Sequence, residues 1–195
     1  MAAPGSGRQA AGHPAGGRQA ALLRGINVGS AKRVAMTDLR ALLESLGFAD
    51  VRTLLNSGNV VYSAPRVAPV EAAARIEAAL PKRLGVSARV VALAAAELTA
   101  AVERNPLAAV ADDPSRLLVA VPADPGGIGL LAPLAEQPWR DEALVVGPRV
   151  AYLWCPDGVI ASALAAAVER ALDGAVTSRN WTTMVKLALA AESRG

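Results

Sequence analysis

Three short polar stretches hold the residue types that could bind an anion. Residues 24–30 follow an apolar run and contain an arginine, an asparagine and two glycines, residues 57–59 read Ser-Gly-Asn, and Arg179-Asn180 precedes an apolar segment. A guanidinium group suits forked recognition of phosphate or carboxylate, and hydroxyl and amide groups add neutral donors. The candidate ligand-binding residues are therefore Arg24, Asn27, Ser57, Asn59, Arg179 and Asn180.

Each stretch also has a purely structural interpretation. The glycines after Arg24 can simply turn the chain, and they do not form a P-loop, because three residues separate them instead of four and no Gly-Lys-Ser/Thr follows. Residues 57–59 are first of all a turn whose side chains can bond each other. Asn180 can cap a helix and Trp181 can lie in the core. Arg179 has no comparable structural explanation.

Several kinds of chemistry are excluded or disfavoured. The chain has one histidine, His13, in a Gly/Pro-rich segment, which argues against Ser-His-Asp triads and histidine-built zinc sites. The single cysteine, Cys155, follows an apolar run and precedes a proline, as a packed thiol would. We see no metal-ligand spacing and expect no metal and no cofactor. Whether the protein is an enzyme stays open, and catalysis would have to come from Arg, Asn, Ser, Asp or Lys.

Composition and charge set the broad class. Of 195 residues, 53% are hydrophobic, which is ample for a core, yet no run approaches the ~18 apolar residues of a membrane span. The formal net charge is only +3, with basic ends and an acidic middle, too small a surplus to indicate a nucleic-acid binder by itself. One cysteine favours the reducing cytoplasm. We expect residues 1–17 to be a disordered extension.

The order of apolar patterns and turns predicts one unit twice. The first repeat is expected as a strand at 19–23, a helix from an N-cap at Thr37, a hairpin of 51–55 and 60–62, a helix over 69–84 that Pro81 should end or kink, and a strand at 88–93. A short helix near 97–103 connects it to strand 117–121, a weak helix near 130–136, hairpin 143–146 and 150–154, a strong helix over 159–172 and strand 175–177. A last helix carries Trp181, Met184, Val185 and Ala188 on one face.

We therefore predict an α+β fold, a duplicated ferredoxin-like architecture of two β-α-β-β-α-β repeats with a C-terminal helix. The expected domains are residues 18–110 with the connecting helix and residues 111–195 with the C-terminal helix. A sheet of order 4-1-3-2 brings the loop after the first strand to the turn at 57–59. If the last helix packs across the first repeat, Arg179 approaches Arg24, and one anion could serve both. We expect replacing either arginine by alanine to cost less than ~1 kcal/mol in stability.

The quoted residues resemble one known family. The run 21–29 (Ala-Leu-Leu-Arg-Gly-Ile-Asn-Val-Gly), residues 57–60 (Ser-Gly-Asn-Val), Asn105-Pro106 and residues 177–183 (Thr-Ser-Arg-Asn-Trp-Thr-Thr) are similar to the bacterial family called domain of unknown function 1697. The resemblance extends from about residue 19 to 191. It implies a duplicated ferredoxin-like fold and no known activity.

Three functions compete at this point. The leading hypothesis is a cytoplasmic protein that binds a small anion, phosphorylated or not, at the end of the first sheet. The alternative is single-stranded nucleic-acid binding, because one repeat has the topology of an RNA-recognition motif, although nucleic acid is disfavoured since the third strand offers only Tyr62 for stacking. A purely structural or partner-binding module is the third. No membrane association is expected, and the oligomeric state is left open.

Overall fold

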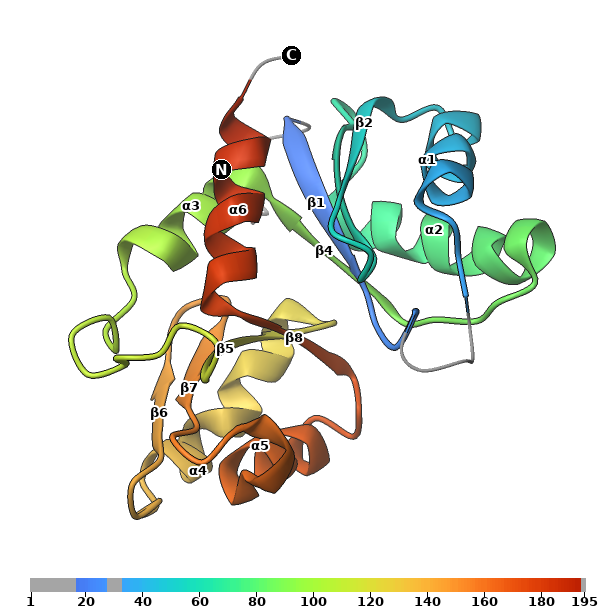
Figure 1. Cartoon of the computed structure of the whole chain (residues 1–195). Coiled ribbons are helices and arrows are strands. Elements are labelled where there is room, and N and C mark those ends of the chain that lie inside the picture. The colour runs from blue at the N-terminus through green and yellow to red at the C-terminus, as the bar shows by residue number, and fades with distance from the viewer. Residues whose placement is uncertain (1–16, 28–32, 194–195) are drawn as a thin grey trace, which may run out of the picture.

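The computed structural model describes residues 17–27 and 33–193 (Figure 1). The first repeat consists of β1 (Arg18–Leu23), α1 (Met36–Ser45), β2 (Ala49–Leu54), β3 (Asn59–Ser63), α2 (Pro69–Leu84) and β4 (Val90–Ala94), and α3 (Ala95–Glu103) follows. The second consists of β5 (Leu117–Pro122), the 3-10 helix η1 (Pro125–Leu131), α4 (Ala132–Ala135), β6 (Ala143–Val146), β7 (Ala151–Trp154), the 3-10 helix η2 (Val159–Ala161), α5 (Ala163–Ala171) and β8 (Val176–Asn180), and α6 (Trp181–Glu192) ends the chain's regular structure. The predicted extension, apart from residue 17, and residues 28–30 of the predicted loop lie outside the described residues.

The two sheets have the same topology. Their strand orders are β2-β3-β1-β4 and β6-β7-β5-β8, and all their pairings are antiparallel. When the strands of each repeat are numbered one to four and the sheet is read from its other edge, both orders become 4-1-3-2. This is the ferredoxin-like arrangement. The duplicated α+β fold predicted from the apolar patterns is therefore confirmed.

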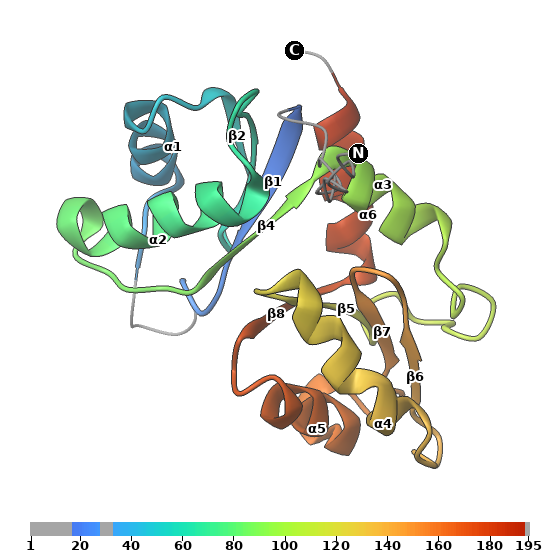
Figure 2. The same ribbon diagram turned by 180° about the vertical axis from the view of Figure 1, so that it is seen from behind.

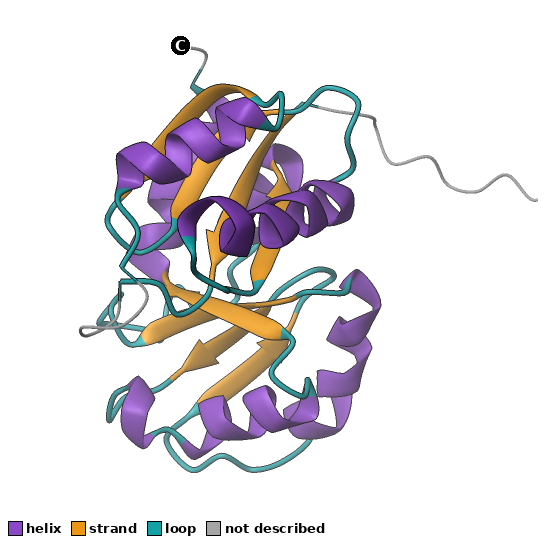
Figure 3. Ribbon diagram, turned by 90° about the vertical axis from the view of Figure 1, so that its right-hand side faces the viewer, coloured by secondary structure: helices purple, strands orange, loops and turns teal. Residues whose placement is uncertain are grey.

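Helices cover both faces of the first sheet (Figure 1). α1 and α2 lie on one face and enclose a core of their own, while α3 and α6 lie on the other. α4 and α5 cover the far face of the second sheet (Figure 2). The remaining faces of the two sheets share a single apolar cluster with α3 and α6, which we call the central core. Figure 3 shows the two repeats stacked one above the other.

Strand β1 shows why its sequence is an unbroken apolar run. Successive side chains of a strand point to opposite faces. Ala21 and Leu23 therefore pack in the core under α1 and α2, whereas Ala20 and Leu22 pack in the central core, and all four are buried. A strand with both faces covered needs apolar residues at every position.

The predicted N-cap of the first helix is wrong. The helix begins at Met36, so Thr37 lies within its first turn, and Ala35 is the N-cap although its side chain cannot accept a hydrogen bond. The Ala35 carbonyl accepts from the N–H groups of Asp38 and Leu39 at 3.1 and 3.0 Å. The side chain of Asn27 binds both backbone groups of Val34, the residue before this cap. This contact fixes the chain just before the helix, which therefore starts earlier than a cap at Thr37 predicts.

The second helix differs from its prediction at two positions. Pro81 lies inside α2, which continues to Leu84 and stops at Gly85 with a left-handed φ of 67°. A proline removes only one hydrogen bond of the last turns, which the buried face of the helix offsets. The apolar spacing of Val70, Ala73, Ile76 and Leu80 predicts that all four lie on the buried face of this helix. Val70 is instead 53% exposed, while the other three are buried.

Two further helix predictions are corrected. The strong helix expected over 159–172 is broken: η2 ends at Ala161 and α5 starts at Ala163, because Ser162 caps α5 by accepting from the N–H of Ala165 at 2.9 Å. On α6 the buried residues are Thr183, Met184, Leu187, Ala188 and Ala191, while Trp181 and Val185 are only half-buried. Both faces of this helix meet packing partners, since one contacts α3 and another the first sheet. Across the described part of the chain, the helices are too short or too polar for a membrane span.

Candidate functional site

The end of β1 meets the turn of the first hairpin. Leu22 pairs with Asn59, and the N–H of Leu23 donates to the Gly58 carbonyl at 2.8 Å. Beyond the strand, Nδ2 of Asn27 donates to the Asn56 carbonyl at 2.8 Å. The predicted meeting of the loop after the first strand with the turn at 57–59 is confirmed.

Asn27 ties this turn to the start of α1. Its backbone has a left-handed φ of 55°, a conformation that asparagine tolerates better than most residues. Its Nδ2 also donates to the Val34 carbonyl at 2.9 Å, and its Oδ1 accepts from the Val34 N–H at 2.8 Å. Both amide donors are therefore used within the protein.

Ser57 and Asn59 bond each other across the hairpin turn. Asn59 is fully buried, and its Nδ2 donates to Oγ of Ser57 at 2.8 Å and to the Leu54 carbonyl at 3.3 Å. These contacts use the amide nitrogen of Asn59 and leave its Oδ1 as an acceptor. That acceptor is bound by Arg179.

Arg179 reaches from β8 of the second repeat into the first. Its Nε donates to Oδ1 of Asn59 at 2.6 Å, and its Nη2 donates to the carbonyls of Leu23 and Ser57 at 2.7 and 3.3 Å. Its Nη1 donates to Oγ1 of Thr177 and to the carbonyl of Ser178, both at 2.9 Å. All five N–H bonds have acceptors, and every acceptor is neutral. Burial lowers the pKa of Arg179 to about 10, so the group remains a cation at neutral pH.

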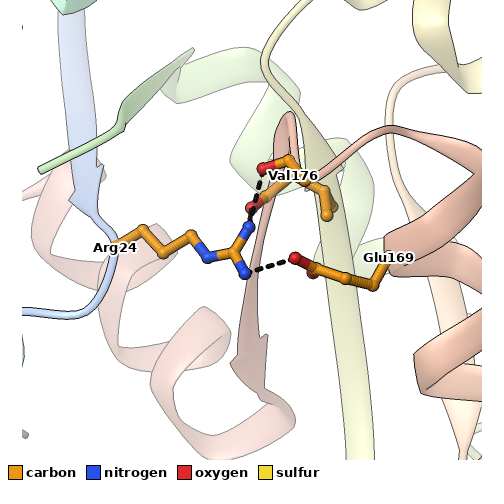
Figure 4. Close-up of polar contacts among 4 residues, drawn as sticks. Arg24, Glu169 and Val176 are labelled. Carbon is orange, nitrogen blue, oxygen red and sulfur yellow. Dashed lines mark hydrogen bonds and ion pairs between the residues drawn. The ribbon is translucent and has the colours of Figure 1, made fainter.

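Arg24 reaches in the opposite direction, from the end of β1 into the second repeat (Figure 4). Its Nη1 donates to the carbonyls of Gly174 and Val176 at 2.6 and 3.2 Å. Its Nη2 forms an ion pair with Glu169 of α5, and both side chains are about two-fifths exposed. Arg24 therefore joins the repeats through the segment that leads into β8.

The two arginines have separate partners. Arg24 binds a carboxylate and two carbonyls of the second repeat, whereas Arg179 binds only neutral groups, three of them in the first repeat. α6 does pack across the first sheet, as the shared-anion hypothesis required. Among the described contacts, however, the two guanidinium groups share no acceptor.

Asn180 is the N-cap of α6. Its Oδ1 accepts from the N–H and the hydroxyl of Thr183 at 3.0 and 2.6 Å. This contact occupies the side-chain oxygen, which is the structural role that the sequence offered as the alternative.

A cavity of about 570 Å³ opens beside Arg24. Arg89 is the second cation of its lining, and Gly25, Ser87 and Gly174 also face it. Arg89 immediately precedes β4, and its carbonyl accepts from the N–H of Arg24 at 2.8 Å. The sequence reasoning missed Arg89. Its position directly before a strand paired with β1 was the signal that could have found it.

Carboxylates already partner both cations of this cavity. Glu77, also in the lining, lies 3.4 Å from Arg89 in a partly exposed ion pair, and Glu169 pairs with Arg24. Within residues 17–27 and 33–193, no group of three or more His, Cys, Asp or Glu side chains could hold a metal ion. The arrangement offers charge and hydrogen-bond donors, and it provides no nucleophile paired with a base.

Comparisons with known proteins define the class of protein. The family described as "Protein of unknown function (DUF1697)" matches residues 17–152, so the chain belongs to this family. Among solved structures, the chain is similar to the conserved bacterial protein SP0830 from Streptococcus pneumoniae, with a TM-score of 0.67 and 21% identity over 90% of this chain and 98% of that one. At this identity the likeness shows the fold alone. No curated protein matches the chain.

Proposed function

We propose that the protein binds a small anion in the cavity at the end of the first sheet, with Arg24 and Arg89 as the groups that contact it. The observation that carries the proposal is that these two cations, together with Ser87, line one cavity. Its volume of about 570 Å³ is in the range of small-molecule sites.

Arg24 retains donors for a ligand. Two carbonyls take the hydrogens of Nη1, and Glu169 takes one of Nη2, so Nε and the second Nη2 hydrogen have no acceptor among the described contacts. The two carbonyl bonds hold the guanidinium in place before any ligand arrives. A preorganised donor loses little conformational entropy on binding.

The ion pairs with Glu169 and Glu77 are weak barriers to such a ligand. Each is about two-fifths to one-half exposed, and exposed pairs contribute about 0–1 kcal/mol. A doubly charged anion offers more negative charge to both arginines than either single carboxylate. It would displace or outcompete these partners at small cost.

The other five predicted residues act in this proposal by positioning. Arg179 and Asn59 hold the end of β1 against the hairpin, and Ser57 supports Asn59. Asn27 holds the start of α1, and Asn180 caps α6. The proposal includes a cytoplasmic location, because the single cysteine, Cys155, is a free thiol, as is usual in a reducing compartment.

The test uses inorganic pyrophosphate as the probe. Thermal unfolding of the full chain is measured with increasing pyrophosphate against sodium chloride of equal ionic strength. A ligand that binds only the folded state raises the melting temperature by mass action. Arg89→Ala should remove most of this rise, and Glu169→Gln should enlarge it, because it deletes the competing carboxylate while leaving Arg24 on its two carbonyls.

The matched control is Arg83→Ala, which deletes another exposed cation of the first repeat, outside the cavity. It should respond to pyrophosphate as the unmodified protein does. Equal melting-temperature rises in the Arg89→Ala variant and the control would refute the proposal, as would a smaller rise in Glu169→Gln.

A further inference from the structure

A second cavity lies on the opposite side of the second sheet from α5, between α3 and the hairpin of β6 and β7. Its volume is about 470 Å³. Nine of its thirteen lining residues are Ala, Val, Pro or Gly, and Tyr152 adds an aromatic ring. The cavity adjoins the central core, to which Ala101, Val150 and Tyr152 belong.

Small side chains on α3 leave this space open. Ala96 and Ala100 lie one helical turn apart and both face the cavity, where Val145 and Pro148 line the hairpin side. Protein interiors are normally close-packed, and an open apolar surface is a common feature of binding sites. The apolar body of a small molecule would complete the packing that alanine leaves undone.

The cavity has few polar groups, and not all of them have a hydrogen-bond partner. The Tyr152 hydroxyl donates to the Ala101 carbonyl at 2.8 Å. Glu97 accepts from the Ala94 N–H at 2.8 Å and lies 3.3 Å from Nε of Arg149. Arg149 is largely buried, and its Nη1 donates to the Pro122 carbonyl at 2.9 Å, but its Nε lacks a hydrogen bond of good geometry.

Arg104 supplies a cation without a carboxylate. It is the C-cap residue of α3 and lines the cavity, it is exposed, and it forms no ion pair with the described residues. Arg104 and Tyr152 both line the cavity, so this cation and the aromatic ring border the same space. Two cations and one carboxylate give the lining a net positive charge.

We propose that this cavity binds a small organic acid with an apolar body, whose acidic group is held by Arg104 at the mouth. The apolar lining accommodates the body, and the surplus cation selects an anion over a neutral molecule or an amine. The site is separate from the cavity beside Arg24, and neither proposal depends on the other.

The experiment measures displacement of a fluorescent probe from the full chain. The probe is 8-anilinonaphthalene-1-sulfonate, an aromatic sulfonate, and the competitors are octanoate, octan-1-ol and octylamine. Octanoate should displace the probe at a concentration about three- to fivefold lower than octanol, because an exposed ion pair changes an affinity by a factor of this size. Octylamine should require the highest concentration. Equal potency of all three would overturn the proposal.

Two variants, each with a matched control, show whether the ligand binds in this cavity. Arg104→Ala should bring octanoate to the potency of octanol, while Arg83→Ala, a matched exposed arginine, should leave the ratio unchanged. Ala100→Trp fills the cavity and should abolish displaceable probe binding, while Ala41→Trp, on the exposed face of α1, should not. Arg104 is exposed, so its variant stays folded even if the tryptophan is not tolerated. An unchanged octanoate preference in Arg104→Ala would refute the site.

Discussion

Nε of Arg179 donates a 2.6 Å hydrogen bond to Oδ1 of Asn59, and this contact joins the closing strand of the second repeat to the hairpin of the first. The two residues are 120 positions apart in the sequence. Asn59 is fully buried, so the bond is shielded from water. Through this bond Arg179, whose five hydrogen-bond acceptors are all neutral, links the second repeat to the first.

Replacing Arg179 by alanine should destabilise the protein by about 2–4 kcal/mol, because it leaves Oδ1 of Asn59 and the Leu23 carbonyl without their donor. This exceeds the loss of less than ~1 kcal/mol that the sequence predicted, because the sequence did not show the partners of Arg179. Chemical denaturation of the Arg179→Ala and Asn59→Ala variants and of the double variant measures the coupling, which should exceed ~1 kcal/mol. Additive effects of the two substitutions would contradict the importance of this bond.

Gly58→Ala should cost more than the usual penalty for a left-handed residue. Gly58 has a φ of 74°, and an added Cβ would lie 2.7 Å from Cδ1 of Ile26 and 2.8 Å from Cβ of Leu23. Gly85→Ala is the matched control, since Gly85 has a φ of 67° with no atom within 4 Å of the added Cβ. We expect a loss of about 1 kcal/mol for Gly85→Ala and at least ~2 kcal/mol for Gly58→Ala by denaturant titration. Equal losses would show that the turn relaxes freely.

Tyr62 should contribute to unfolding at alkaline pH. Burial raises its pKa well above the ordinary value of 10.0, and its hydroxyl donates to Oε1 of Gln19 at 3.1 Å. Above pH 10 the unfolded chain loses this proton while the folded protein keeps it, so stability falls as the pH rises, by up to ~1.4 kcal/mol per pH unit. The slope between pH 10 and 11.5 should be shallower for Tyr62→Phe. Parallel slopes for the two proteins would rule out this contribution.

Affinity for single-stranded nucleic acid should be weak and should vanish near physiological salt. The sheet faces that would stack bases in an RNA-recognition motif are covered by α3 and α6 in the central core. Binding could then come only from phosphate contacts, which weaken steeply with salt. Fluorescence anisotropy of a labelled oligonucleotide at 50 and 150 mM salt measures this. Submicromolar affinity at the higher salt would revive the nucleic-acid hypothesis.

Periodic burial made much of the fold predictable. Leu39, Leu42 and Leu43 share one helix face, and all three are buried against the first sheet. The run at 20–23 has the unbroken hydrophobicity of a strand covered on both faces. The predictions failed where a side chain forms a hydrogen bond with the backbone near a helix start. Ser162 caps a helix inside a longer helical pattern, and Asn27 binds Val34 just before α1, which starts earlier than predicted.

The sequence by itself determined both repeats, their strand order and the meeting of the first loop with the hairpin turn, because these follow from short-range patterns and from the topology of one sheet. Only the tertiary structure decided what Arg24, Arg89 and Arg179 contact. Their partners depend on how the two repeats dock around α3 and α6, and docking depends on side-chain packing between segments more than a hundred residues apart, which no local periodicity records.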